Sequence, residues 1–463
     1  MSDRSLAEEL KSITGPAGCL DGEAARDWRV PPFPNAPKRA AKAIVRPANT
    51  DEVSRVLKAC HAAGQSVIVA GGLTGLVHGA DSSGGDVILS LERMNRIRAI
   101  DAANRTMTAE AGVIIQTLQE EAEAQGLIYP VDWGARGSAM LGGSLATNAG
   151  GNRVIRYGMT RDRVLGIEAV LADGTVIDNL SGLIKNNAGY DLKNLLIGSE
   201  GTLAVITAAV LRLSEKPVSQ CVALVCSPSF ESVTSLLRRM DQTLGGQLSA
   251  FEVMWRNSYE VLTSTPEAGR PPKLAPAPYT VLIEAMGPDI ARDQVQFEAA
   301  LEGALEAGLI DDAVIAKSAD EVHAIWRIRD NVFAFAAHWP IFTFDVSLPI
   351  GAMEAYIAQL DARLQAEFAA AKLFVFGHLG DGNLHLIAAP GAGDAAARAK
   401  VEALVYEPLQ SFRGSVSAEH GIGLEKRAWL SATRGPHEIA LMRQIKQVFD
   451  PKNILNPGRI LPD

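Results

Sequence analysis

Residues 131–158 read VDWGARGSAMLGGSLATNAGGNRVIRYG, a stretch that is rich in glycine. Its glycines, together with Ser138, Thr147 and Asn148, predict a long segment without regular structure inside a domain. Loops of this kind are usually functional. Glycine lets the backbone approach a ligand closely, and the polar side chains can donate hydrogen bonds to phosphates or to a heterocycle. The stretch therefore predicts a ligand-binding loop.

Two further glycine-rich stretches flank it along the chain. Residues 67–80 read VIVAGGLTGLVHGA, where a predicted strand runs into glycines whose N–H groups can point at an anion. This is neither a phosphate-binding P-loop nor a clean G-x-G-x-x-G fingerprint, and taken alone it is compatible with a tight turn. In the other stretch, 197–207 (IGSEGTLAVIT), Glu200 lies between small residues just before a predicted strand.

The chain has 463 residues, which exceeds the roughly 250–300 that one hydrophobic core serves, so two or more domains are expected. After an N-terminal helix and the proline-rich connector PPFPNAPKRA, residues 43–72 give a strand–helix–strand pattern with Thr50 as the candidate helix N-cap. Residues 164–180 predict a hairpin with its turn at Asp173-Gly174.

The pattern of predicted secondary structure changes after residue 216. Strand-like runs at 219–227 and 278–287 alternate with helix-like runs at 230–240 and 290–308. This alternation predicts an antiparallel sheet with helices packed on one face. A last helix is expected at 435–450.

Bulk properties exclude some classes of function. The net charge of −9 argues against nucleic acid as the main partner. The four cysteines are scattered, which indicates neither a disulfide framework nor a cysteine zinc site. No window approaches the ~20 apolar residues of a membrane span, and the N-terminus lacks an apolar signal core, so a cytoplasmic protein is expected.

Histidines gather in two other glycine-rich turns, GHLGDGNLH at 377–385 and SAEHGIG at 417–423. If strands lead into and out of the first turn, the imidazoles of His378 and His385 can point to one side. Glu419 and His420 would add a carboxylate and a third imidazole. Two histidines and one carboxylate are a common ligand set for a divalent metal with open coordination positions.

The three glycine-rich stretches and the terminal NPGRI (456–460) resemble the FAD-binding domain of the vanillyl-alcohol oxidase/p-cresol methylhydroxylase superfamily, from about residue 38 to the end. The resemblance implies an α+β fold. It comprises a two-part FAD-binding domain of the p-cresol methylhydroxylase (PCMH) type, an antiparallel-sheet, ferredoxin-like substrate-binding (cap) domain, and a C-terminal helical segment that returns to the flavin. The expected division is 1–37, 38–216, 217–420 and 421–463.

The same resemblance assigns cofactor-binding residues. The implied FAD-binding set is Gly71, Gly72, Leu73, Thr74, Gly75, Gly137, Ser138, Gly142, Gly143, Asn148, Gly151, Glu200, Ile206 and Asn456. One departure is His78, at a position where relatives commonly show glycine. Some members of the superfamily attach flavin through histidine, but the subfamily that this chain resembles binds FAD non-covalently, so non-covalent FAD is expected here.

Within the superfamily, the histidine motifs resemble the branch that contains D-lactate dehydrogenase, the flavin subunit of glycolate oxidase and D-2-hydroxyglutarate dehydrogenase. The resemblance implies that His378, His385 and Glu419 ligate a divalent metal, with zinc expected. His420 would be the general base, and Arg329 would bind the substrate carboxylate. Arg327 and Arg329 are two residues apart on a predicted helix, so they cannot face the same way.

Three positions bear on the substrate. D-2-hydroxyglutarate dehydrogenases usually carry a threonine, a lysine and an asparagine where this chain has Phe333, Thr343 and Ile387. The apolar replacements, Phe333 and Ile387, would leave a second carboxylate without partners, and an unpartnered carboxylate is costly to desolvate. We therefore expect a monocarboxylic, D-lactate-like 2-hydroxyacid, with D-2-hydroxyglutarate and glycolate as alternatives.

Two other classes of function stay open from the residues. A metal-dependent hydrolase would use the same histidine cluster but would leave the glycine stretches unexplained. A non-catalytic flavoprotein subunit would not need His420 and Arg329. For the dehydrogenase, the resemblance also implies an electron acceptor (an electron-transferring flavoprotein, a quinone or a cytochrome) and a homodimer.

Overall fold

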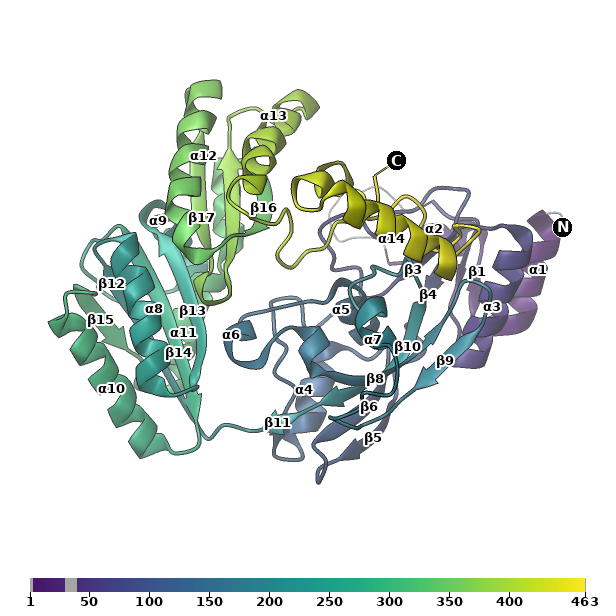
Figure 1. Ribbon diagram of the computed structural model, residues 1–463, viewed down its shortest axis with the longest axis horizontal. Helices are drawn as coiled ribbons and strands as arrows, with labels where there is room; N and C mark the ends of the chain where they lie inside the picture. Colours follow the sequence, from purple (N-terminus) through teal and green to yellow (C-terminus); the bar gives the residue numbers. More distant parts are fainter. Residues whose placement is uncertain (1–2, 30–39, 463) are drawn as a thin grey trace. The chain divides into compact units, whose positions relative to one another are not determined.

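The structure is a computed structural model that describes residues 3–29 and 40–462 (Figure 1). The chain forms two compact units. Unit 1 comprises Met1–Gly151, Gly158–Lys216 and Glu419–Asp463, and unit 2 comprises Asn152–Tyr157 and Pro217–Ala418. Most of the proline-rich connector, residues 31–39, lies outside the described residues.

Unit 1 contains the elements of the expected FAD-binding part. Its helices are α1 (Asp3–Thr14), α2 (Gly22–Asp27), α3 (Thr50–Ala63), α4 (Ile115–Glu123), α5 (Leu141–Thr147), α7 (Leu192–Leu196) and α14 (Pro436–Phe449). Its strands are β1 (Cys19–Leu20), β2 (Ala43–Val45), β3 (Val67–Ala70), β4 (Val87–Ser90), β5 (Ile97–Asp101), β6 (Thr106–Glu110), β7 (Leu127–Ile128), β8 (Val164–Val170), β9 (Val176–Asn179), β10 (Val205–Arg212) and β11 (Ser214–Glu215).

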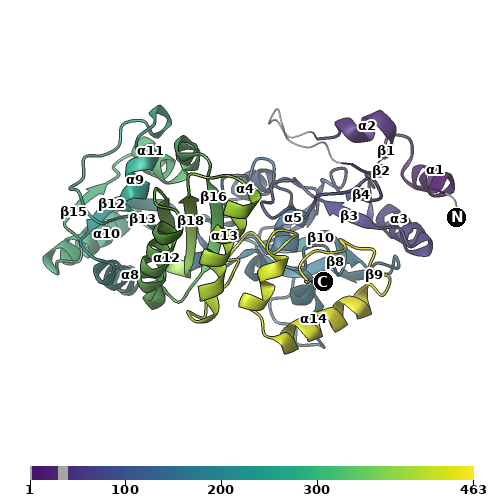
Figure 2. The same cartoon turned by 90° about the horizontal axis from the view of Figure 1, so that it is seen from above.

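The first sheet of unit 1 has the strand order β1-β2-β4-β3, in which β4 pairs in parallel with β2 and with β3. The apolar side of α3 packs on one face of this sheet, and Ala25 and Trp28 pack on the other. Helix α1 lies beside α3 (Figures 1 and 2). The N-cap of α3 is Asn49, whose Oδ1 accepts the N–H of Glu52 at 2.9 Å. The prediction of Thr50 was wrong by one residue, and its hydroxyl instead donates to Glu168.

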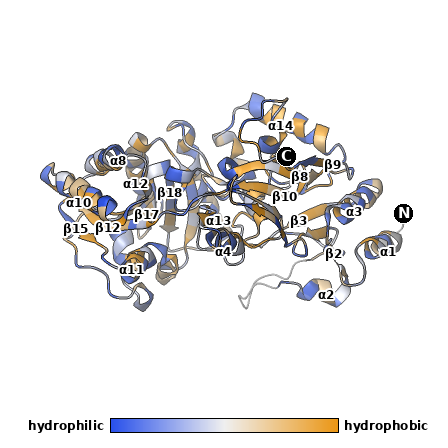
Figure 3. Cartoon of the chain, turned by 90° about the horizontal axis from the view of Figure 1, so that it is seen from below, coloured by the Kyte–Doolittle hydropathy of each residue, from blue (hydrophilic) through white to orange (hydrophobic). Residues whose placement is uncertain are grey.

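The second sheet of unit 1 is antiparallel, in the order β5-β6-β10-β8-β9. The predicted hairpin is confirmed as β8 and β9, with Gly174 at φ 88° in the turn. Helices α4 and α5 cover one face and share a core with β6, β8 and β10. In Figure 3 the central strands β8 and β10 are coloured largely hydrophobic.

Helix α5 corrects the prediction that the glycine-rich stretch lacks regular structure. The helix forms although it contains Gly142 and Gly143, because it packs closely on the end of β6. The N–H of Gly142 donates to the carbonyl of Ala111 at 2.7 Å, and a Cβ at Gly142 would lie only 2.8 Å from the Ala111 Cβ. Tertiary packing thus outweighs the low helix propensity of glycine.

Unit 2 contains the second half of the fold. Its helices are α6 (Val154–Tyr157), α8 (Phe230–Leu244), α9 (Arg256–Leu262), α10 (Ile290–Glu306), α11 (Ala319–Asp330), α12 (Met353–Glu367) and α13 (Ala395–Tyr406). Its strands are β12 (Ser219–Ser227), β13 (Leu248–Trp255), β14 (Tyr279–Gly287), β15 (Asp312–Ile315), β16 (Phe342–Ser347), β17 (Lys372–His378) and β18 (Asn383–Ala389).

These strands form one antiparallel sheet in the order β15-β12-β14-β13-β17-β18-β16. The α+β class with antiparallel sheets is therefore confirmed. Helices cover both faces, with α9 and α11 on one side and α8, α10 and α12 on the other (Figure 2). The expectation of helices on one face was wrong, because β12 buries successive residues such as Leu224 and Val225 and so needs cover on both sides.

No helix within 3–29 and 40–462 combines the length and apolar character needed to cross a membrane.

Candidate active site

A cavity in unit 1 opens where the glycine-rich stretches meet. The end of β3, the start of α5, the loop before β10 and the C-terminal segment contribute to its wall. Of the predicted cofactor-binding residues, those that line it are Gly71, Gly142, Gly143, Glu200, Ile206 and Asn456. The sequence segments that were expected to share one ligand thus surround one space.

Close backbone packing explains why glycine is needed at this wall. A Cβ on Gly72 would overlap the carbonyl oxygen of Ser138 and would lie 2.9 Å from the Cα of Ala139. A Cβ on Gly71 would come within 3.4 Å of the Cα of Gly143. The glycine-rich stretches 67–80 and 131–158 are therefore in backbone contact, and a larger residue at Gly72 would force them apart.

Other predicted cofactor residues lie outside the cavity lining, namely Gly72, Leu73, Thr74, Gly75, Gly137, Ser138, Asn148 and Gly151. Asn148 ends α5 in the left-handed conformation, with φ 50°, and its Oδ1 accepts the N–H of Arg161 at 2.9 Å. The N–H of Gly151 donates to Glu419 Oε1 at 2.8 Å. In this structure, both residues make contacts that shape the loop.

Glu200 joins the cavity to the turn that follows His420. Its carboxylate accepts the N–H groups of Ile422 and Gly423 at 2.7 and 2.8 Å. Burial raises the pKa of Glu200, although these two hydrogen bonds and the charge of Lys426 oppose the shift. Asn456 links Glu200 to β3, because its Nδ2 donates to the Glu200 carbonyl at 2.6 Å and its Oδ1 accepts the N–H of Val69 at 2.8 Å.

The histidine turn of unit 2 has the predicted shape. Strands β17 and β18 lead into and out of it, and the ring centroids of His378 and His385 lie 5.2 Å apart. His378 is buried and His385 is half-buried. The two imidazoles therefore stand on one face of the sheet, as expected for adjacent strands.

A buried ion network surrounds His378. Glu252 on β13 contacts His378 Nδ1, and it accepts a hydrogen bond from Arg329 Nε at 2.8 Å. Arg329 Nη2 lies 3.1 Å from His378 Nε2. Burial alone would raise the pKa of Glu252, but the charges of Arg329 and His378 and their hydrogen bonds lower it to about 2.

These contacts assign the tautomer of His378. An ionised carboxylate can only accept a hydrogen bond and a guanidinium can only donate one. Nδ1 must therefore carry the proton that points at Glu252, and Nε2 must hold the lone pair that faces Arg329. Arg329 is 7% exposed, whereas Arg327 is exposed, so the two arginines do face different ways.

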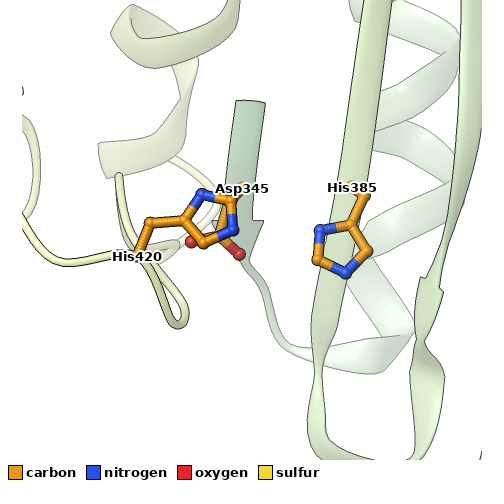
Figure 4. A group of neighbouring side chains, drawn as sticks. All are labelled: Asp345, His385 and His420. Carbon is orange, nitrogen blue, oxygen red and sulfur yellow. The ribbon is translucent and has the colours of Figure 1, made fainter. Parts of the chain in front are cut away.

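Asp345 on β16 is a buried carboxylate directly opposite His385 on β18, and Figure 4 shows both side chains. Its Oδ2 accepts the N–H of Ala418 at 3.1 Å. Ala418 is the last residue of unit 2, and Glu419 and His420, the latter also drawn in Figure 4, follow it directly in the chain.

Comparison with known proteins shows the family of this chain. Residues 41–179 match the family model "FAD binding domain", and residues 216–460 match "FAD linked oxidases, C-terminal domain". The D-2-hydroxyglutarate dehydrogenase of Xanthomonas citri pv. viticola is 39% identical over 440 residues, which cover 94% of this chain and 91% of that protein. The Stutzerimonas stutzeri enzyme of the same name is 35% identical, with 99% of both chains covered.

The chain belongs to the FAD-linked oxidase family. Its fold is shared with p-cresol methylhydroxylase, whose substrate-bound structure superposes with a TM-score of 0.77 at 16% identity, covering 99% of this chain and 97% of that one. The resemblance read from the glycine-rich stretches is thereby confirmed. This FAD-linked oxidase is a FAD-dependent oxidoreductase, and six of the residues predicted to bind the cofactor line the cavity of unit 1.

Sequence reasoning missed part of the site of this FAD-linked oxidase. It named neither Glu252 nor Asp345, although each is a single acid within an otherwise mostly apolar strand, which is a readable signal. It also missed the mostly small or apolar part of the cavity wall, formed by Val69, Ala70, Leu91, Ala111, Ala146, Ser199, Gly201 and Ala204. The sequence does not mark such residues as cavity-lining, because small and apolar residues also occupy ordinary core positions.

Proposed function

We propose that this chain is a D-2-hydroxyacid dehydrogenase, which oxidises the substrate to a 2-oxoacid by transferring a hydride to FAD. The observation that carries the proposal is the buried Arg329 beside His378, with His385 on the neighbouring strand. An arginine fork suits a carboxylate, and paired imidazoles suit a divalent cation. When bound, FAD supplies the hydride acceptor that protein side chains lack.

The protein's own residues have separable roles in this proposal. Arg329 holds the substrate carboxylate and so orients the Cα–H bond. His420 accepts the hydroxyl proton as the hydride leaves Cα, which gives the 2-oxoacid; bound FAD would take up the hydride. An external electron acceptor would be needed to return FAD to its oxidised form.

His378, His385 and Glu419 would hold a divalent metal, for which we propose zinc. The donor set fits, because His378 Nδ1 is engaged by Glu252 and the lone pair of Nε2 is the coordinating electron pair. Glu419 follows Ala418, which is fixed to Asp345 beside His385, and consecutive Cα atoms are only ~3.8 Å apart. A bound cation would supply the Lewis acidity that makes a hydroxyl easier to deprotonate.

The substrate we propose is monocarboxylic and D-lactate-like. Ile387 packs in the apolar cluster of unit 2 with Phe374 and Phe376, so it offers no polar partner. Phe333 is 82% exposed and is likewise apolar. A second carboxylate placed against the buried Ile387 would lose its hydration without compensation, and Phe333 has no polar group to bind it.

A second candidate, D-2-hydroxyglutarate, is favoured by the names of the relatives at 35–39% identity. The ratio of kcat/KM for D-lactate to that for D-2-hydroxyglutarate separates the two. A ratio above one supports the monocarboxylic substrate, and a strong preference for the dicarboxylate overturns it.

Anaerobic reduction of the bound flavin tests the proposed reaction itself. A panel of D- and L-2-hydroxyacids is mixed with the purified holoprotein, with and without a chelator, and flavin bleaching is followed by absorbance. We expect bleaching by D-enantiomers and slower bleaching after chelation. A flavin that no 2-hydroxyacid bleaches would contradict the proposed function.

A further inference from the structure

We propose that Glu252 is a positioning residue that fixes both the metal-binding nitrogen of His378 and the substrate-binding fork of Arg329. The inference rests on the proposed function of these two residues. Glu252 is 1% exposed and lies on β13, directly opposite His378 on β17. One carboxylate thus touches two groups of the site, which come from residues 126 and 77 positions away in the chain.

The contact to His378 selects one tautomer. With Nδ1–H donated to Glu252, only Nε2 can offer a lone pair to a cation. A histidine that binds metal usually donates its other ring N–H to a carboxylate or carbonyl, which sets the ring orientation and raises ligand basicity. Glu252 occupies that position for His378.

The contact to Arg329 matters because Nε2 has a single lone pair. A hydrogen bond from Arg329 Nη2 and a bond to a cation exclude each other at this atom. When Nε2 binds a cation, Arg329 Nη2 must turn to another acceptor, and the substrate carboxylate is the acceptor that the proposed function supplies. The hydrogen bond from Arg329 Nε to Glu252, 2.8 Å long, does not involve Nη2. It can therefore keep the guanidinium at the site while Nη2 changes its acceptor.

Glu284 is a second buried acid on the same face of this sheet, and its hydrogen-bond partners lie outside the proposed site. It is also fully buried, and it accepts from Arg153 Nε at 2.8 Å, Gln220 at 2.7 Å, Ser249 at 2.8 Å and Trp326 at 3.1 Å. None of these four partners is a proposed metal ligand or Arg329. Glu284 therefore provides a control with the same charge, burial and strand environment.

The experiment compares Glu252→Gln with Glu284→Gln in the full-length holoprotein. Zinc affinity is measured by competition with a chromophoric chelator, independently of activity, and KM and kcat are measured with D-lactate. We expect Glu252→Gln to weaken zinc binding about 10–100-fold and to raise KM at constant metal saturation. Glu284→Gln should lose stability but keep both values.

The outcomes separate this inference from the proposed function. If the wild-type protein binds no zinc and chelation leaves flavin reduction unchanged, the proposed metal site fails and the inference fails with it. If the wild type binds zinc but Glu252→Gln matches Glu284→Gln in zinc affinity and in KM, only the role of Glu252 is overturned.

A measurement on the wild-type protein covers the case in which Glu252→Gln does not fold. In zinc-loaded protein labelled with ¹⁵N-histidine, we expect His378 to show a protonated, slowly exchanging Nδ1, assigned by its loss in His378→Asn. A proton on Nε2, or a metal bond at Nδ1, would overturn the assignment.

Discussion

The Glu200 carboxylate accepts the backbone N–H of Ile422 at 2.7 Å, across 222 residues of sequence. Through this bond, a residue that lines the cavity of unit 1 holds the turn that follows His420. Glycine at 421 and 423 permits the turn, since both residues have positive φ values of 84° and 54°. We therefore expect the position of the proposed base to depend on Glu200, a predicted cofactor-binding residue.

Replacement of Glu200 by glutamine tests this dependence. A glutamine offers only one acceptor oxygen, so one buried N–H at 422 or 423 loses its partner, which costs about 1–3 kcal/mol. We expect a lower melting temperature and a lower kcat, with FAD still bound as judged by its absorbance. An unchanged kcat in a folded, flavin-loaded variant would contradict the link between Glu200 and His420.

Replacement of Arg329 by lysine should weaken substrate binding. A lysine cannot present two parallel N–H donors to a carboxylate, and a hydrogen bond to a charged group is worth about 1.5–3 kcal/mol, or roughly 10–150-fold in binding. We expect KM for the 2-hydroxyacid to rise by about that factor. The matched control is Arg327→Lys, which changes an exposed residue of the same helix. If both variants behave alike, Arg329 is not the carboxylate ligand.

Replacement of His420 by asparagine should slow the chemical step. General base catalysis contributes about 10²–10⁴-fold, so we expect the rate of anaerobic flavin reduction to fall within that range while FAD binding persists. His437→Asn, at an exposed position of α14, serves as the control. If His420→Asn reduces its flavin at the wild-type rate, His420 is not the general base.

The ion pair of Glu284 with Arg153 makes stability depend on pH. Burial alone would raise the pKa of Glu284, but Arg153 and the side-chain hydrogen bonds outweigh burial and hold the pKa below its ordinary value. The stabilisation is therefore present above the unfolded pKa, about 4.3, and is lost as the pH falls through the lower folded pKa.

Urea unfolding of wild type and Glu284→Gln between pH 3 and 7 checks this dependence. We expect a difference in unfolding free energy of about 3–5 kcal/mol at pH 7, which narrows below about pH 4. A difference that stays constant over the whole range would show that the carboxylate charge contributes nothing.

Asn383 has a stability cost that substitution can relieve. Its amide is 4% exposed, and neither its oxygen nor its nitrogen has a hydrogen-bond partner among the described residues. Burial of an unpaired polar group costs about 1–3 kcal/mol, so Asn383→Leu should raise the melting temperature. A lower melting temperature would indicate that the amide is satisfied in solution. Leu384→Ala, which removes a fully buried apolar side chain next in the strand, should lower it.

The FAD-linked oxidase family could be predicted from local residue patterns, because glycine positions that allow close backbone approach, such as Gly72, are visible in a short stretch of sequence. Local patterns also predicted the strands around the histidine turn, since alternation in a strand places His378 and His385 on predictable sides. Arg329 could be chosen over Arg327 only through resemblance, and the structure shows that the two do point apart.

The contacts between distant strands became visible only in the folded chain. The register of β13 against β17 brings Glu252 to His378, and the packing of α5 against Ala111 lets a helix form through two glycines. Likewise, Asn152–Tyr157 belongs to unit 2, where Arg153 pairs with Glu284, 131 residues away. Side-chain packing depends on neighbours from distant segments, so a local residue pattern does not identify which distant strand will lie beside it.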